Sequence, residues 1–127
     1  MIELERIHHV TIATKSLEKA KEFYSEILKF KEIERPPFKS RGVWYDLGQQ
    51  QLHVVENPKS ETLRLGGLNS LEGHLSIWVK SYTKTLQWLE EIGLEYEIEP
   101  NSVAGFSQIY ILDKDKNIIE FAAPYHS

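Results

Sequence analysis

The feature that most constrains this chain is an internal repeat at an offset of 65 residues. The residues that are identical at this offset include His9/His74, Ile12/Ile77, Lys15/Lys80, Ser16/Ser81, Lys19/Lys84, Glu26/Glu91 and Ile27/Ile92. A repeat of this length indicates a fold that is built from two copies of one structural unit. Residues at equivalent positions in the two copies are therefore expected to occupy equivalent places in the fold.

The length of the chain fits one domain that is made of two such copies. A copy of about 60 residues is too small to bury a comfortable core alone, so the two copies, or two chains, are expected to share one. We place the first module at about residues 5–56 and the second at about residues 73–124, within a single domain that spans 1–127. A connection of 17 residues, 57–73, joins them.

Both modules show the same order of expected elements. In the first, the pattern predicts strands over 7–14, 31–34, 43–47 and 51–56, with a helix that begins after Ser16 and runs to Leu28. In the second, it predicts strands over 75–79, 94–99, 107–112 and 117–122, with a helix that begins after Ser81 and ends at Gly93. The chain is therefore expected to be an α+β protein of two tandem βαβββ modules.

Composition excludes several classes of partner. The net charge of −4 argues against nucleic acid, because phosphate binding needs a basic face. The sequence has no apolar run that is long enough to span a bilayer, and it has no cysteine to form disulfides or ligate metal. We expect a cytoplasmic protein that acts on a small molecule.

Strand parity identifies four polar residues at equivalent places. His9 and His74 alternate with apolar residues in the first strands, so their side chains are expected to face away from the helices. In the last strands the helix-facing pairs are expected to be Leu52/Val54 and Ile119/Phe121, which leaves His53 and Glu120 on the other face. Three imidazoles and a carboxylate suit a divalent transition metal. The alternative is a polar lining for a ligand cleft that contains no metal.

The chain resembles the vicinal oxygen chelate superfamily, which groups glyoxalase I, bleomycin resistance proteins and extradiol dioxygenases. The resemblance is carried by five stretches in order: 9–12 (HVTI), 23–30 (FYSEILKF), 51–56 (QLHVVE), 73–77 (GHLSI) and 113–120 (DKDKNIIE). It implies a cupped mixed sheet around a metal or ligand cleft. The sequence departs from the family at Lys29, where a glycine is common, and in the turn after Asp113, where relatives often have proline and glycine.

The resemblance also implies an activity and a cofactor. It implies one divalent ion per site (Zn, Ni, Mn, Co or Fe) at His9, His53, His74 and Glu120, and a substrate chelated through vicinal oxygens. Lyase, isomerase and dioxygenase reactions all occur in such families; the additional ligand His53 favours a lyase or isomerase with an enolate-like intermediate. Glu120 is expected to be the catalytic base, as the only carboxylate of the four. The alternatives are a non-catalytic ligand-binding or resistance protein, and an extradiol-type dioxygenase.

Further residues are candidates for a substrate pocket. The hairpin pairing would put Trp44 beside His53 and Tyr110 beside Glu120, and Trp78 shares a face with His74. Arg41 and Arg64 lie in the two long loops and could meet a substrate carboxylate. The competing interpretation makes the aromatics plain core and the arginines solvated surface. A homodimer is expected, because the edges of small open sheets would otherwise be exposed.

Overall fold

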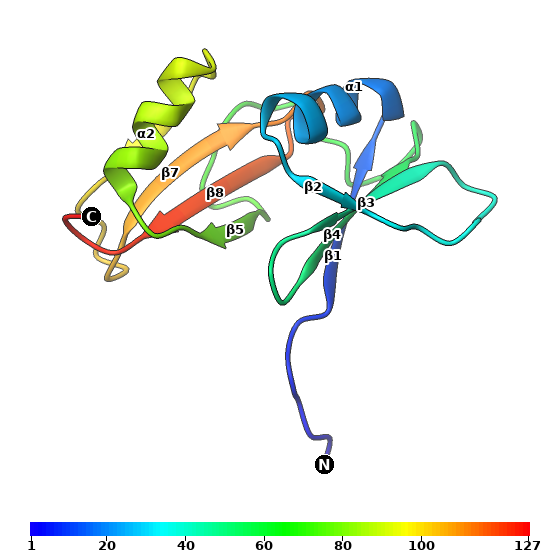
Figure 1. Cartoon of the computed structure of the whole chain (residues 1–127), viewed down its shortest axis with the longest axis horizontal. Coiled ribbons are helices and arrows are strands. Elements are labelled where there is room, and N and C mark those ends of the chain that lie inside the picture. The colour runs from blue at the N-terminus through cyan, green and yellow to red at the C-terminus, as the bar shows by residue number, and fades with distance from the viewer. The chain divides into compact units, whose positions relative to one another are not determined.

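The computed structural model describes all 127 residues, which divide into two compact units, Met1–Leu63 and Arg64–Ser127. The first unit contains β1 (His9–Thr14), α1 (Leu17–Lys21), η1 (Glu22–Ile27), β2 (Lys31–Ile33), β3 (Gly42–Asp46) and β4 (Gln51–Glu56). The second contains β5 (Leu75–Trp78), α2 (Tyr82–Glu91), β6 (Glu97–Glu99), β7 (Ser107–Leu112) and β8 (Ile118–Ala123) (Figure 1). The two tandem βαβββ modules predicted from the repeat are confirmed.

Each unit has its own open four-stranded sheet, and the strand order is the same in both. The orders are β1-β4-β3-β2 and β5-β8-β7-β6, with the first and last strands of each unit paired in parallel. The registers also agree, because Thr11 pairs with His53 in one sheet and Ser76 pairs with Glu120 in the other. His53 and Glu120 therefore occupy the same position in the two sheets.

The two helical segments begin in the same way. Ser16 and Ser81 are both extended N-cap residues, and their side chains accept hydrogen bonds from the backbone N–H groups of Lys19 and Lys84. An N-cap hydroxyl satisfies one of the N–H groups that the first helical turn leaves unpaired. The repeated serine thus fixes the start of the helix in each unit.

The helical segments end differently, and the regular helix expected up to Leu28 is not what the structure shows. Its second half is the π-helical segment η1, in which the N–H of Leu28 donates to the carbonyl of Phe23 at 2.8 Å. A π-turn accommodates one more residue than an α-turn. Accordingly the left-handed residue after the helix is the thirteenth after Ser16, Lys29 (φ 61°), but the twelfth after Ser81, Gly93 (φ 74°).

The core of each unit lies between its helical segment and one face of its sheet. Tyr45 and Leu52 are neighbours across β3 and β4, both fully buried, and the Tyr45 ring lies 5.7 Å from that of Tyr24 in η1. In the second unit Phe121 of β8 is buried and meets Trp88 of α2 edge-on at 6.2 Å. Side chains alternate along a strand, so His53 and Glu120 must lie on the opposite faces.

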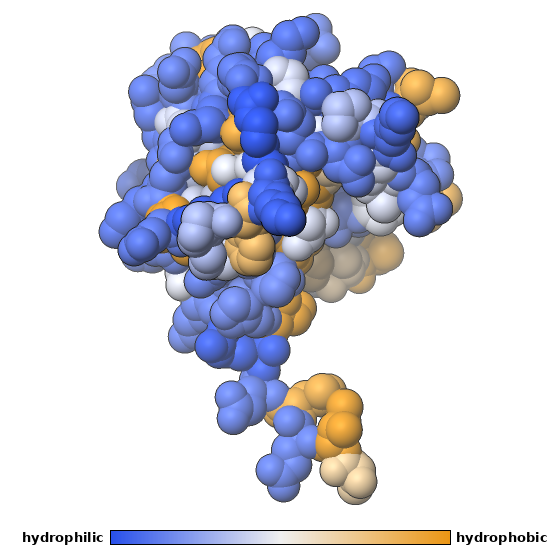
Figure 2. Space-filling view, turned by 90° about the vertical axis from the view of Figure 1, so that its right-hand side faces the viewer, coloured by the Kyte–Doolittle hydropathy of each residue, from blue (hydrophilic) through white to orange (hydrophobic).

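Residues 1–8 form no helix or strand, although the strand was predicted to begin at Ile7. The first strand pair joins His9 to Gln51, where β4 begins, so Ile7 has no partner in the sheet. Ile7 is 65% exposed, and Met1, Ile2 and Leu4 are more exposed still. Figure 2 shows this segment projecting from the first unit with apolar residues on its surface. None of the helices has the length and apolar character that crossing a bilayer would require.

Candidate functional site

Two half-sites lie on the sheet faces that point away from the helices, one in each unit. We call His9 and His53 the histidine half-site, and His74 and Glu120 the acidic half-site. Neither unit by itself brings together three or more His, Cys, Asp or Glu side chains that could hold a metal ion. Each half-site is therefore described separately below.

In the histidine half-site, His53 is stacked between two rings. Trp44 is its cross-strand partner on β3, and the two rings are parallel within 3° at a centroid distance of 3.9 Å. On the other side, from β1, the His9 ring lies 4.1 Å away at 16°. The hairpin neighbour predicted for His53 is thus observed. This stacking leaves His53 only 6% exposed.

Polar contacts fix the orientation of both imidazoles. His53 Nε2 lies 2.8 Å from Gln51 Oε1, and His9 Nδ1 lies 2.8 Å from His8 Nδ1. Burial, and then the neighbouring His9, His8 and Arg35, lower the pKa of His53 to about 4. His53 is therefore neutral at pH 7, and a neutral imidazole is the form that binds metal.

The histidine half-site opens into a pocket of about 410 Å³ within the first unit. Its lining consists of His8, His9, Thr11, Arg35, Phe38, Ser40, Trp44, His53 and Val55. The aromatic faces of Phe38 and Trp44 lie 6.0 Å apart at one side of it. Pockets of this size hold small molecules and are usually apolar with a few placed polar groups, which matches this lining.

In the acidic half-site, His74 contacts the carboxylate of Glu120. The two atoms, His74 Nε2 and Glu120 Oε1, are 2.9 Å apart, and His74 Nδ1 donates to the carbonyl of Glu72 at 2.8 Å. Gln108 Nε2 donates to the other carboxylate oxygen at 3.3 Å. Glu120 is 3% exposed, so this carboxylate is held in a dry environment by polar partners on both oxygens.

Tyr110 forms part of the wall of the acidic half-site. It is the cross-strand partner of Glu120, as the hairpin pairing predicts, and its ring meets that of His74 edge-on at 5.8 Å. Burial, and then the charge of Glu120, raise the pKa of Tyr110. Its hydroxyl is therefore protonated at neutral pH and can act as a hydrogen-bond donor.

The residues present fit a divalent metal in their chemistry. Two ligands bound at 2.0–2.2 Å around a right angle are about 3 Å apart, close to the separation of His74 Nε2 and Glu120 Oε1. The carbonyl of Glu72 holds the proton on His74 Nδ1, which leaves Nε2 for a metal, as second-shell carbonyls do. His9 and His53 supply nitrogen donors, but their parallel rings do not converge on one point in this structure.

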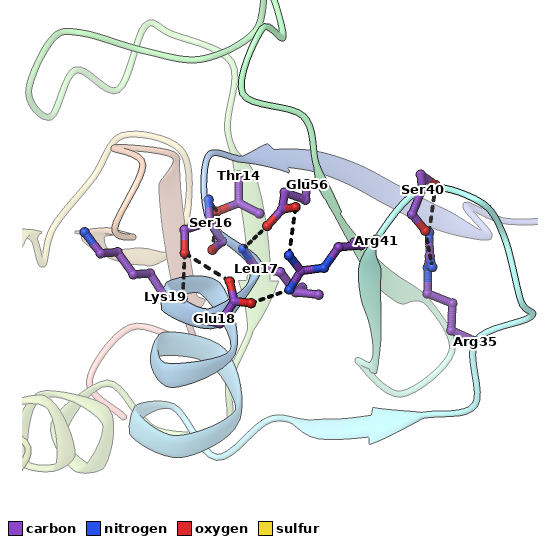
Figure 3. Close-up of polar contacts among 9 residues, drawn as sticks. All are labelled: Thr14, Ser16, Leu17, Glu18, Lys19, Arg35, Ser40, Arg41 and Glu56. Atoms are coloured by element: carbon purple, nitrogen blue, oxygen red, sulfur yellow. Dashed lines mark hydrogen bonds and ion pairs between the residues drawn. The ribbon is translucent and has the colours of Figure 1, made fainter.

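Arg41, one of the two arginines predicted to meet a substrate, is engaged elsewhere (Figure 3). Its guanidinium bonds to Glu18 and, at 3.2 Å, to Glu56 Oε1, and the other oxygen of Glu56 accepts the N–H of Leu17 at 2.8 Å. These contacts tie the start of α1 to β4. Arg41 is not among the residues that line the pocket.

Arg64 and Trp78 also lie apart from the half-sites. Arg64 donates to the carbonyls of Lys116 and Gly67 at 2.7 and 2.9 Å, so it braces the turn between β7 and β8. Trp78 ends β5, is 60% exposed and meets Phe106 edge-on at 5.9 Å. Neither Arg64 nor Trp78 contacts His74 or Glu120 within the second unit.

Three residues of the half-sites were not predicted. Gln51 and Gln108 bond to His53 and Glu120, and Arg35 lines the pocket beside His53. Gln51 has the same strand parity as His53, which is a signal that the sequence does carry. Arg35 lies in a proline-rich loop whose course strand parity does not specify.

Comparisons with known proteins agree with this fold. A sequence model for the Glyoxalase/Bleomycin resistance protein/Dioxygenase superfamily matches residues 6–121. The chain is 31% identical to the uncharacterized protein YwkD of Bacillus subtilis (92% of this chain, 95% of the relative). It is 26% identical to "Glyoxylase I 4" of Arabidopsis thaliana (94% and 71%). The structure superimposes on that of a glyoxalase family protein from Bacillus anthracis with a TM-score of 0.80, at 23% identity and 98% coverage of both chains.

Proposed function

The chain belongs to the glyoxalase/bleomycin resistance/dioxygenase superfamily, and we propose that it is a metal-dependent lyase or isomerase within it. His9, His53, His74 and Glu120 would hold one divalent ion, from among Zn, Ni, Mn, Co and Fe. The substrate is a small oxygen-rich molecule that presents two vicinal oxygens. A bound divalent ion would supply Lewis-acid stabilisation of negative charge on those oxygens.

One observation carries this proposal: the geometry around His74 and Glu120. The backbone carbonyl of Glu72 accepts from Nδ1 of His74, and Nε2 of the same ring lies 2.9 Å from a buried carboxylate oxygen of Glu120. A carboxylate that is 3% exposed requires a compensating charge or proton. A divalent ion that is shared with the imidazoles would provide that charge.

Glu120 is the proposed general base. It would take a proton from the carbon next to a substrate carbonyl and return it to a neighbouring atom, so that the reaction needs no external oxidant. Gln108 bonds to Oε2 and would keep the carboxylate oriented while Oε1 exchanges partners. The Tyr110 hydroxyl beside it is a candidate donor to a substrate oxygen.

Metal content tests the proposal directly. Protein purified without added metal is expected to contain about one divalent ion per chain by elemental analysis, and its removal should lower the melting temperature because the folded state loses a ligand. The double variant His53→Ala, His74→Ala should bind far less metal. Full occupancy in that variant would contradict the proposed ligand set.

A second candidate is a metal-free binding or resistance protein. It is favoured by the contacts of His53, whose Nε2 is already paired with Gln51 and whose ring is stacked on Trp44. With these contacts His53 lines the pocket, in addition to being a potential metal ligand. Wild-type protein that binds ligands of the pocket but contains no metal would support this second function.

We also propose that the protein works as a homodimer in the cytoplasm. The strands β1 and β5 each lie at the edge of a sheet, and an edge strand presents unpaired backbone groups that a second chain can cover. Light scattering of the metal-loaded protein should give twice the mass of one chain. A monomeric mass with the metal still bound would overturn this assembly.

A further inference from the structure

The lining of the histidine half-site pocket is unusual in its charge. It contains one guanidinium, Arg35, and three imidazoles, but no Asp or Glu. The chain as a whole carries more acidic than basic residues, with a net charge of −4. A guanidinium in a pocket that no carboxylate lines, in an otherwise acidic protein, forms a surface suited to an anion.

Arg35 is held in place by contacts that leave its charge unneutralised. Its Nη1 donates to the carbonyl of Ser40 at 2.9 Å and its Nη2 to the hydroxyl of Ser40 at 3.1 Å (Figure 3). The guanidinium carbon lies 5.0 Å above the ring of Phe38. No acidic side chain is within ion-pair distance of Arg35, whereas Arg41, in the same loop, has two such partners.

The loop is shaped to accept this guanidinium. A Cβ at Gly42 would lie 2.9 Å from both Cζ and Nε of Arg35 and 2.6 Å from the carbonyl oxygen of Val54, so only glycine leaves room there. Nε is buried against this backbone and has no hydrogen-bond partner. Each Nη atom carries two N–H groups and uses one on Ser40, so one N–H on each remains for a ligand.

We propose that Arg35 binds an anionic group of the substrate, and that the substrate is therefore a small carboxylate or phosphoryl compound. This deepens the proposed function, because the same pocket would hold the vicinal oxygens beside His9 and His53. The N–H groups that Ser40 leaves free on Nη1 and Nη2 point away from each other, so one of them would donate a single charge-assisted hydrogen bond to an oxygen of the anion. A carboxylate is the source of the anion that we favour. The rings of Phe38 and Trp44 would exclude water from the contact and strengthen it.

The test measures the binding of three small molecules, two of which differ mainly in charge. L-lactate and hydroxyacetone both have vicinal oxygens, but only lactate carries a carboxylate; inorganic phosphate is the third probe. Metal-free protein is titrated with each at low ionic strength, where screening is weak. Binding is followed by NMR through the indole N–H signal of Trp44, which a Trp44→Phe variant identifies.

The variants are Arg35→Gln, Arg35→Lys and the control Lys39→Gln, which removes a positive charge from the same loop outside the pocket lining. Arg35→Gln should bind lactate about tenfold or more weakly than wild type, the scale of a lost charged hydrogen bond. Arg35→Lys keeps the charge but loses the guanidinium that Ser40 holds in place, so its affinity for lactate should lie between those of wild type and Arg35→Gln. Lys39→Gln should match wild type, and hydroxyacetone should not distinguish the four proteins.

Unchanged lactate affinity in Arg35→Gln, with the melting temperature preserved, would overturn the proposal. So would a wild-type protein that binds neither lactate nor phosphate. If phosphate binds more tightly than lactate and loses the same factor in Arg35→Gln, the anion is phosphoryl rather than carboxylate. Because the titration uses metal-free protein, its result does not depend on whether the proposed metal site exists. If the protein binds metal but Arg35→Gln binds lactate as tightly as wild type, only the proposed anion subsite is contradicted.

Discussion

The two half-sites share one register and differ in charge. Both have a polar residue at the same position of the last strand, flanked across the hairpin by an aromatic: His53 with Trp44, and Glu120 with Tyr110. No Asp or Glu lines the pocket of the histidine half-site, whereas the acidic half-site contains a buried carboxylate. With the roles proposed for Arg35 and Glu120, anion binding would belong to one unit and proton acceptance to the other.

The strand that flanks each half-site shows the same divergence at a second position. Gly42 pairs with Val55 in β3 and β4, and Gln108 pairs with Ala122 at the equivalent place in β7 and β8. The glycine leaves room for the Arg35 guanidinium, and the glutamine reaches across to Glu120. One backbone position therefore makes space for a cation in one unit and orients the carboxylate in the other.

The largest effect is expected when the acidic half-site loses its charge. Glu120→Gln keeps the shape and an oxygen but cannot accept a proton, so kcat should fall by about two to four orders of magnitude while metal is retained. His53→Gln places the same side chain at the equivalent position of the other unit. It should weaken metal binding but, when loaded with metal, lose less in kcat.

This comparison requires an active substrate, which a screen of α-hydroxy ketones, thiohemiacetals and catechols with several metals can provide. The rates are read together with metal content for each variant. Comparable losses of kcat in both variants at full metal occupancy would contradict the division of roles. Near wild-type turnover by Glu120→Gln would move the base to another residue.

A smaller effect, on stability, is expected when the space beside Gly42 is filled. Gly42→Ala forces a methyl group against the backbone oxygen of Val54 and against Arg35, so it should reduce the free energy of unfolding by about 1–3 kcal/mol. Gly73→Ala is the control, because a Cβ there meets nothing within 4 Å. Urea denaturation of both variants measures the difference. Equal stability would show that the loop moves aside, and that Arg35 is less fixed than its contacts indicate.

The smallest effect concerns the residue after each helical segment. Lys29 and Gly93 both have positive φ, which costs an ordinary side chain about 1 kcal/mol. Lys29→Gly should therefore stabilise the protein by about 0.5–1 kcal/mol, and Gly93→Ala should destabilise it by a similar amount. Melting temperatures should shift in opposite directions. Shifts of the same sign would mean that the two helix ends are not equivalent.

Much of this organisation follows from the sequence, because it depends on periodicity. A repeat fixes the order of elements, and alternation along a strand fixes which face a residue occupies. Together with the hairpin pairing of the last two strands of each module, these rules place His53 beside Trp44 and Glu120 beside Tyr110.

The remaining features depend on contacts that periodicity does not encode. Arg41 and Arg35 lie six residues apart in one loop, yet one pairs with Glu18 and Glu56 while the other lines the pocket. Their roles follow from the path of the loop around Gly42. The π-helical segment is likewise not evident from the sequence, because the apolar residues between Leu17 and Leu28 recur at the spacing of a regular helix.

That extra residue makes the first helical segment longer than the second without moving either half-site to the other face of its sheet. An insertion inside a strand moves every later side chain to the opposite face of the sheet, and so would carry His53 into the core. A helix absorbs the same insertion as a local bulge and restores its direction within a turn. Loops tolerate it as well, since the hairpin loop 47–50 has four residues and its counterpart 113–117 has five. The differences in length at η1 and in this loop therefore leave His53 and Glu120 at the same position of their sheets.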